Sequence, residues 1–397
     1  MWWLSWELGV RSLKSLHHFQ LQGKHMKKVT TFKQALNVFV PKIQAELRRV
    51  VAPPVEQAGC MFMEGQDVYP TDEFYGMLHY HLGWVDEKLQ PLHKTGGKLL
   101  RPVFTMLTCQ ACGASHEKAL TAAAAVELVH NFTLIHDDIQ DNSDTRRGRT
   151  TVWKIWGQPQ AINAGDTMFI IARNALLDLP KQGVPFQTTL EAINTLDHAS
   201  LALCKGQYLD MSFEKRLDIN LSDYLDMIKG KTGALLGCAG YLGGLIATDS
   251  PQKATIFKCL GETLGSAFQI QDDWLGIWGR ESVTGKPAAD DLRNRKKSLP
   301  VVFALNQIQP PTHLMQGEGS QTLSNQFREI YAADMLTETD IATAVTLLEE
   351  MGAKTYMEAQ AKHYAEKAYQ ILQNIEASSE DIAILQEMTQ FFVKRMY

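Results

Sequence analysis

The chain has 397 residues, of which 45% are hydrophobic and 21% charged, and its formal net charge at pH 7 is −5. This composition is typical of a globular protein with a large core. A net negative charge excludes a general attraction to nucleic acid, so any anion binding must be local. No apolar run reaches the ~18–20 residues that a membrane-spanning helix needs. The longest candidate, 234–247, has 14 residues and contains several glycines.

The cysteines and the N-terminal stretch bear on location and domain organisation. Six cysteines without framework spacing indicate a reducing compartment, and we expect a cytoplasmic protein. Cys109 and Cys112 form a lone CxxC pair in an apolar run, which we interpret as core rather than as a zinc or redox site. Residues 1–25 are compatible with an interfacial anchor, a transit peptide or an extension upstream of Met26. We favour the extension and predict one domain over 26–397.

The periodicity of the chain is helical rather than strand-like. Apolar residues recur at helical spacing over 31–51, 72–89, 161–177, 188–213, 221–247, 337–351 and 354–375. A polar stretch with two prolines and two glycines, 309–326, predicts a surface loop. Because no run of alternating strand-like segments is present, we predict an all-α fold.

The most informative stretch is 121–151, a helix-forming run that ends in acidic and then basic residues. Asp137 and Asp141 lie one helical turn apart, so their carboxylates project from the same face. Adjacent carboxylates repel each other unless a cation lies between them, and oxygen ligands suit Mg²⁺, which takes further oxygens from a substrate phosphate. Arg146 and Arg147 offer fork-shaped donors to the same anion. The pattern predicts a metal–diphosphate site, with a solvated, charged helix end as the alternative.

Two shorter motifs add basic groups. In the segment GGKLLRP, Lys98 and Arg101 are three residues apart and would share one face beside a helix N-terminus, where amide donors favour an anion. Lys231 and Thr232 form a polar pair before a glycine-rich apolar run. Each pair is also compatible with a solvated helix surface.

A second acidic motif, AFQIQDDWLG, occupies 267–276 and brings Gln269, Asp272 and Asp273 together among large apolar residues. Carboxylates in such surroundings are rarely buried without a partner or a metal. The segment that follows, TGKPAADDLRNRKKSLP, contains Lys286, Lys296 and Lys297. Acidic and then basic groups therefore recur in the same order as in the first motif. This recurrence argues against the two clusters being solvated surface charges without a function.

Over roughly residues 70–390, these motifs resemble those of the trans-type, or short-chain, polyprenyl diphosphate synthases. The shared parts, in order, are GGKLLRP, DDIQD with RRG, Lys231–Thr232, FQIQDDWLG, and TGK with the ending K-x-S-x-P. Each motif alone is weak, whereas all of them in this order are specific. The resemblance implies an all-α bundle around a deep central cavity, with the two aspartate motifs facing each other at its mouth, and a homodimer.

The resemblance also implies a reaction and roles for individual residues. Family members condense isopentenyl diphosphate with an allylic diphosphate (dimethylallyl, geranyl or farnesyl), whose diphosphate binds three Mg²⁺ ions. The metal ligands would be Asp137, Asp141 and Asp272, and the rest of the catalytic set Asp138, Asp273 and Lys231. The allylic diphosphate would be held by Arg146, Lys231, Thr232, Gln269 and Lys286, and Lys296 would be a further substrate-binding residue. The diphosphate of isopentenyl diphosphate would be held by Lys98, Arg101, His130 and Arg147.

Two other functions share this pattern in part. A class I terpene cyclase also ionises a diphosphate but has no anion site for a second substrate, and a noncatalytic partner subunit would have eroded metal motifs. The basic residues and the intact DDIQD argue against both. The chain departs from the family pattern at two positions: Gly276 stands where many members have a third aspartate, and Ala289 replaces a glycine in the lysine loop. We expect both to be variants within active enzymes, and Gly276→Asp to change activity little.

Product length is predicted from the residues before Asp137. Thr133, four residues earlier, lies on the same face ~6 Å below it. Phe132 lies ~7.5 Å below but is turned away from that line, so helical geometry alone does not make it the floor of a tunnel. In the family, an aromatic at this position limits extension. One aromatic with no insertion between Asp138 and Asp141 resembles synthases of the twenty-carbon product, geranylgeranyl diphosphate, which we expect here, with farnesyl diphosphate as the alternative.

Overall fold

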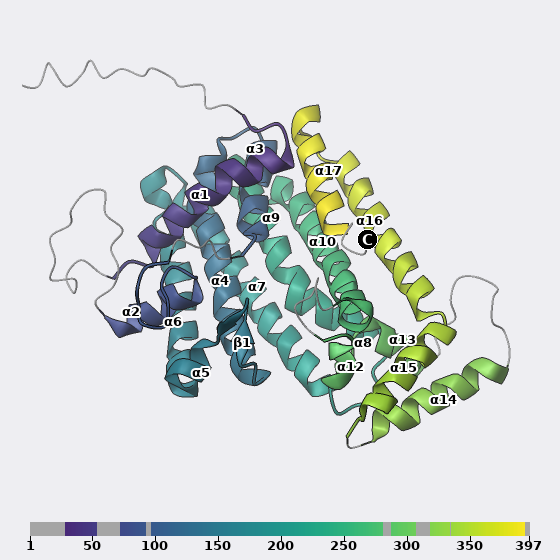
Figure 1. The fold of residues 1–397 in the computed structure, drawn as a ribbon. Coiled ribbons are helices and arrows are strands. Elements are labelled where there is room, and N and C mark those ends of the chain that lie inside the picture. Colours follow the sequence, from purple (N-terminus) through teal and green to yellow (C-terminus); the bar gives the residue numbers. More distant parts are fainter. Residues whose placement is uncertain are drawn as a thin grey trace, which may run out of the picture.

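The computed structural model describes residues 28–53, 72–92, 97–280, 287–306, 318–333 and 335–393, so that the stretch 1–25 and Lys286 lie outside the described residues. The helices of the first half are α1 (Phe32–Val50), α2 (Glu73–His81), α3 (Leu100–Ala111), α4 (Leu120–Gln140), α5 (Val152–Trp156), α6 (Gln158–Leu177) and α7 (Phe186–Phe213). Those of the second half are α8 (Leu221–Ile228), the π-helix η3 (Lys229–Gly233), α9 (Ala234–Thr248), α10 (Pro251–Trp278), α12 (Asp290–Arg293), α13 (Leu299–Asn306), α14 (Glu318–Ala332), α15 (Glu338–Glu350), α16 (Ala353–Gln373) and α17 (Ser379–Val393). Two 3₁₀ turns, His116–Ala119 and Leu179–Gln182, complete the helical structure of the described chain. The predicted all-α fold is confirmed (Figure 1).

Helix α10 lies in the middle of the fold, with α9 packed along one side and α16 along the other (Figure 1). Its first half contributes Ala254, Phe257 and Leu260 to a large buried cluster with α3, α4 and α9. Its second half contributes Ile270 and Ile277 to a second buried cluster with α13, α15 and α16. The second acidic motif, which lies in this half of α10, is therefore held in place by packing on several sides.

Helix α4 packs closely on α3 and α6 because its alanines at 122–125 are fully buried and small. The helix ends at Gln140, and Asp141 is its C-cap residue. Asp137 thus lies in the last turn of a helix whose direction is set by the core. The close packing of α4 fixes where the first acidic motif emerges.

The only strands within the described residues form a short hairpin after α4, β1 (Thr145–Arg146) paired with β2 (Arg149–Thr150). The two loop residues, Arg147 and Gly148, have φ angles of 54° and 72°, which is the pattern of a type I′ turn. Such a turn matches the natural twist of two antiparallel strands. This ribbon leaves the fold class unchanged, but it fixes the two arginines of the first motif.

The helix predicted over 221–247 is interrupted in the structure. Helix α8 gives way at Lys229 to the π-helix η3, and regular α-helix resumes at Ala234. Single π-turns inside α-helices occur frequently at functional sites. This one carries Lys231 and Thr232, the polar pair of the sequence motif.

Three other predictions of helix boundaries are wrong. The helix predicted over 72–89 ends at His81, because Gly83 follows with a φ of 81° and ends it, and an isolated bridge then joins Val85 and Pro91. Part of the loop predicted over 309–326 is helical, since α14 starts at Glu318.

The third wrong boundary is at the C-terminus, where α17 follows the predicted end of helical structure at 375. The hydroxyl of Ser378 accepts a hydrogen bond from the N–H of Asp381, as a capping residue does. The polar sequence around this cap interrupts the apolar periodicity on which the prediction rested. Helix α17 packs against α10 and α16 and lines the site described below.

The cysteine pair behaves as expected for core residues. Cys109 is fully buried and Cys112 is half-buried at the C-cap of α3. Burial raises the pKa of the Cys109 thiol to about 12 and that of Cys112 to about 11, so both stay protonated at neutral pH. Across the described ranges, none of the helices combines the length and apolarity needed to cross a bilayer.

Candidate active site

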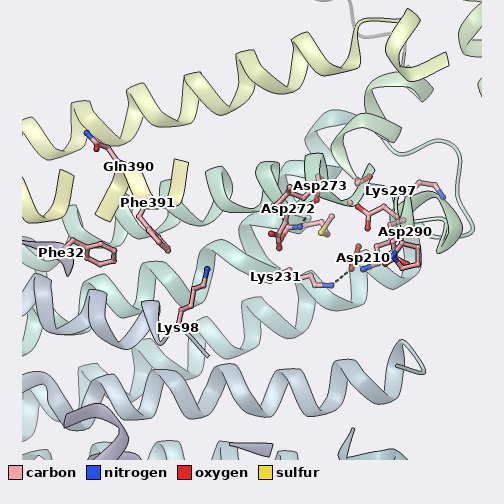
Figure 2. A pocket seen from close by; sticks show the side chains of 18 of the residues that line it. Phe32, Lys98, Asp210, Lys231, Asp272, Asp273, Asp290, Lys297, Gln390 and Phe391 are labelled. Carbon is pink, nitrogen blue, oxygen red and sulfur yellow. Dashed lines mark hydrogen bonds and ion pairs between the residues drawn. The ribbon is translucent and has the colours of Figure 1, made fainter. Parts of the chain in front are cut away.

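Lys98, just before α3, lines two cavities, which therefore meet beside it. The larger, about 1120 Å³, is bounded by α7, η3, α10, α17 and the segment 287–298. Figure 2 shows Lys98 and Phe391 at one end of it and the acidic groups at the other, next to Lys231. The smaller, about 570 Å³, is bounded by the end of α2, the start of α3, α4 and the hairpin.

Asp137 lies in the last turn of α4, near the larger cavity's charged end. Burial raises the pKa of its carboxyl, the ammonium of Lys231 lowers it, and the carboxylate of Asp141 raises it further. The ionised form of Asp137 would therefore gain from an additional cation nearby. Asp141 itself is exposed at the end of the helix.

The neighbouring Asp138 points into the protein instead. It is 2% exposed and accepts a hydrogen bond from Nε of Arg146 at 2.6 Å. Burial raises the pKa of Asp138 to about 6, although the Arg146 guanidinium opposes this shift. The pair joins the end of α4 to the hairpin, so Arg146 uses one of its donors within the protein.

Asp210 on α7 is a further acid of this site that the motifs do not include. Its carboxylate pairs with Nζ of Lys231 (Figure 2). Its charge also acts on the carboxyl of Asp137 and the ammonium of Lys296. Its signal in the sequence is the spacing of Gln207 and Asp210, which puts both on one face of α7. Gln207 donates to the side chain of Gln140 at 3.0 Å, which brings this face to the end of α4.

The two aspartates of the second motif also differ. Asp272 is exposed and lines the larger cavity. Asp273 is 4% exposed and accepts hydrogen bonds from the Tyr224 hydroxyl at 2.7 Å, the Gln269 amide at 2.9 Å and the Leu299 backbone N–H at 2.7 Å. Burial nevertheless raises the pKa of Asp273 to about 7.

Thr232 and Gln269 belong to the same hydrogen-bond chain. The hydroxyl of Thr232 donates to Oε1 of Gln269 at 2.7 Å, and Gln269 donates in turn to Asp273. The chain runs from η3 across α10 to the start of α13. It therefore holds η3, and with it Lys231, against the second acidic motif.

The basic segment after α10 contributes two lysines with different surroundings. Lys296 lines the larger cavity, and although burial alone would lower its pKa, the carboxylates of Asp291, Asp210 and Asp141 together raise it. Lys297 is 2% exposed and donates to the backbone carbonyl of Glu214 at 2.7 Å. Lys296 is thus the lysine of this segment that is surrounded by the acids of the site.

The smaller cavity gathers the basic groups predicted for the second diphosphate. Arg101, His130 and Arg147 all line it, and Nη1 of Arg101 lies 3.3 Å from Nε2 of His130. Glu127, one turn before His130 on α4, is 4% exposed. Burial raises the pKa of Glu127, and the charges of Arg101 and Arg147 lower it. One buried acid therefore balances part of the positive charge of this cavity.

The two residues expected to control product length are both buried. The ring of Phe132 packs against Phe169 on α6, with centroids 5.3 Å apart, and against His136 at 5.7 Å. The Thr133 hydroxyl donates to the backbone carbonyl of His130 at 2.8 Å. Phe132 therefore lies at the contact between α4 and α6.

The donor set suits a hard cation. Among the described residues, no three histidine, cysteine, aspartate or glutamate side chains converge closely enough to form a metal cage by themselves. Mg²⁺, however, is usually bound through one or two carboxylates together with waters and substrate phosphates. The exposed Asp141 and Asp272 and the partly buried Asp137 fit this chemistry.

A family model described as polyprenyl synthetase matches residues 83–333 of the chain. The chain belongs to the polyprenyl synthetase family. It is 34% identical over 319 residues to (2E,6E)-farnesyl diphosphate synthase of Mycobacterium tuberculosis. The aligned region covers 80% of this chain and 85% of that protein. It is 39% identical over 276 residues to geranylgeranyl diphosphate synthase of the same organism. This aligned region covers 70% of this chain and 75% of that protein.

The solved structures agree. The polyprenyl synthetase from Streptomyces coelicolor A3(2) is similar with a TM-score of 0.77 at 33% identity, over 91% of this chain and 99% of that one. The synthase described here is thus a prenyltransferase of the polyprenyl diphosphate type. Because its relatives carry the names of both farnesyl and geranylgeranyl diphosphate synthases, family membership does not decide the product.

The structure accounts for the departure of the second motif at position 276. Gly276 on α10 lies against the side chain of Asp291, and a Cβ added at 276 would overlap with the Asp291 carboxylate. An aspartate at 276 therefore requires Asp291 to move. The overlapping atoms belong to the end of the Asp291 side chain, which a rotation can move away, so the expectation that Gly276→Asp changes activity little stays a prediction.

We expect Gly276→Asp to change activity little but to lower the melting temperature, because the Asp291 side chain must rotate and two neighbouring carboxylates repel each other. The double variant Gly276→Asp/Asp291→Ala removes the overlapping carboxylate and should regain most of the lost stability. Thermal unfolding of both variants and of Asp291→Ala alone measures the effect. Equal melting temperatures for the wild type and Gly276→Asp would show that the segment around Asp291 adjusts without strain.

Proposed function

We propose that the synthase condenses isopentenyl diphosphate with allylic diphosphates by ionisation, condensation and elimination, with geranylgeranyl diphosphate as its product. The observation that carries this proposal is the pair of cavities that meet at Lys98. One contains carboxylates with lysines among them, and the other contains arginines and histidines. A reaction between two diphosphates needs two such anion sites side by side.

In this proposal the allylic diphosphate binds in the larger cavity. Three Mg²⁺ ions, held by Asp137, Asp141 and Asp272, would supply charge that stabilises the departing diphosphate. Lys231 and Lys296 lie among the carboxylates of this site and would contact the diphosphate oxygens. Negative charge grows on those oxygens as the C–O bond breaks, so these contacts strengthen in the transition state and lower the barrier.

The second aspartate of each motif would act by positioning. Asp138 holds Arg146 of the hairpin, and Asp273 holds Gln269 and the start of α13. Both carboxylates are buried and use their oxygens within the protein. We therefore propose that they orient Arg146, Thr232 and Gln269 toward the allylic diphosphate.

Isopentenyl diphosphate would bind in the smaller cavity, where Lys98, Arg101, His130 and Arg147 would hold its diphosphate. Its double bond would attack the allylic cation across the junction of the cavities. Phe268 lines the smaller cavity and would help to keep water away from that cation. We propose the released diphosphate as the acceptor of the proton that is lost in the last step.

The other functions considered from the sequence fit less well. A terpene cyclase has one diphosphate to bind, so it would have no use for a second cavity lined by Arg101 and Arg147. A noncatalytic subunit would have no need for the buried pairs that hold the acidic motifs in place. Farnesyl diphosphate remains the alternative product, since the choice rests on Phe132 and Thr133.

We also propose that two copies of the chain associate through α6 and α7. Large apolar side chains are exposed on these two helices, namely Ile162, Ile170, Leu177, Phe186, Leu190, Leu201, Tyr208 and Met211. The five on α7 recur at helical spacing and form one stripe along it. Exposed apolar side chains grouped along one face in this way are typical of a protein interface. A self-complementary contact between two copies would bury this stripe.

Purified synthase, incubated with Mg²⁺, labelled isopentenyl diphosphate and each allylic primer in turn, should form elongated products that chromatography can size. Asp137→Ala should lower turnover by several orders of magnitude, because it removes a metal ligand at the departing diphosphate. Asp144→Ala is the matched control, since Asp144 is exposed nearby and pairs with Lys154 at the surface. A wild-type protein that cyclises a single diphosphate would support the cyclase instead.

The assignment of product length is tested by two substitutions. Phe132→Ala should open space between α4 and α6 and shift products beyond twenty carbons, whereas Thr133→Phe should shorten them. The chain lengths of the dephosphorylated alcohols provide the measurement. If neither variant changes the distribution, another helix determines the length.

Sedimentation of the wild type should give twice the chain mass of 44.5 kDa. The double variant Leu201→Asp/Tyr208→Asp places charges in the apolar stripe of α7 and should sediment as a monomer. Asp substitutions at exposed positions outside the stripe, such as Gln252→Asp, serve as the control. A variant that remains dimeric would place the interface elsewhere.

A further inference from the structure

The smaller cavity contains a histidine that no motif includes. His81, the last residue of α2, lines this cavity together with Arg101, His130 and Arg147. Its Nε2 is buried and makes no hydrogen bond within the described part of the protein. An unpartnered polar atom in a buried position is rare unless a ligand or water satisfies it.

The position of His81 is fixed by its neighbour in the sequence. Tyr80 donates its hydroxyl to the carbonyl of Thr150 in the hairpin at 2.7 Å. Arg149 donates in return to the carbonyls of Tyr80 at 2.8 Å and Val85 at 2.7 Å, and its guanidinium lies 3.9 Å above the Tyr80 ring. These contacts join the end of α2 to the hairpin, so that His81 keeps its place beside Arg147.

The electrostatic surroundings of His81 match those of His130. Burial and the guanidinium groups of Arg147 and Arg146 together lower the pKa of His81 to about 3, although the side chain of Asn131 acts in the opposite direction. Burial likewise lowers the pKa of His130, which is also close to Arg147, Arg146 and His81. Both imidazoles are therefore neutral at physiological pH. A neutral imidazole can donate one N–H without adding charge to a cavity already crowded with arginines.

We propose that His81 is a further binding residue for the diphosphate of isopentenyl diphosphate, to which its Nε2–H donates a hydrogen bond. The proposal rests on the proposed function of the smaller cavity. It predicts that His81 contributes to the affinity for this substrate alone, because the larger cavity lies beyond Lys98 and does not include His81.

His79 provides a matched control on the same helix. It is 4% exposed, and burial lowers its pKa to about 4, so it is a buried neutral histidine like His81. Its ring packs edge-on against Trp84, with centroids 4.9 Å apart, and it does not line either cavity. Loss of His79 should affect stability without affecting substrate affinity.

The test measures binding of isopentenyl diphosphate by calorimetry in EDTA, together with KM for both substrates and kcat in Mg²⁺. His81→Phe keeps the ring shape but removes the donor, and we expect it to raise Kd and KM for isopentenyl diphosphate about 10-fold or more. The KM for the allylic primer and kcat should change less than about threefold. His81→Gln, which retains an N–H donor, should recover most of the affinity. Arg101→Ala is the positive control, with a loss of about 10- to 100-fold.

Melting temperatures separate folding from binding. If His81→Phe unfolds, His81→Ala, which introduces no bulk, takes its place. Unchanged Kd and KM for isopentenyl diphosphate in these variants, with the expected loss in Arg101→Ala, would overturn the role of His81 and leave the proposed function intact. An equal effect in His79→Phe would show that His81 acts through stability alone and would also overturn the proposal. A wild type that elongates no primer would contradict the proposed function itself.

Discussion

The active site depends on a buried carboxylate in each acidic motif. Asp138 and Asp273 are 2% and 4% exposed, and each accepts a hydrogen bond from the basic segment that follows it in the chain, from Arg146 and from the N–H of Leu299. Leaving a buried hydrogen-bonding group without its partner costs about 1–3 kcal/mol, and more when the group is charged. These two interior contacts help to set the relative positions of acids and bases around the larger cavity, which Asp272, the first aspartate of the second motif, lines.

Each cavity contains groups of opposite charge, which reduce the repulsion between its like charges. Lys231 stands among the carboxylates of Asp137 and Asp210, and Glu127 stands between Arg101 and Arg147. Lys296 adds a further positive charge to the larger cavity, and Asp138 adds a second carboxylate to the smaller one. A cation in the first cavity and an anion in the second would complete the balance. The charges of the two cavities support the proposal that the two diphosphate substrates bind in different places.

Helical periodicity was sufficient to predict the all-α fold. It was insufficient for residues whose role depends on a distant partner. The burial of Asp138 and Asp273 follows from Arg146, Tyr224 and Leu299, and Asp210 gains significance only through Lys231. The hairpin was missed because two residues per strand are too few to show alternation, although Arg147–Gly148 is a loop of the expected kind.

Backbone strain occurs where two helices of the site begin and in the hairpin turn. Non-glycine residues with positive φ include Leu99 before α3, Arg147 in the hairpin and Ala289 before α12, with φ of 49°, 54° and 59°. Each such residue costs of order 1–3 kcal/mol and persists only where its surroundings determine it. Ala289 is 4% exposed and donates its N–H to the carbonyl of Ile277 at 3.2 Å. The glycine expected at this position from the resemblance would adopt this φ without strain. The alanine therefore retains the geometry at the expense of stability, because the contact with α10 holds the lysine segment against the acidic motif.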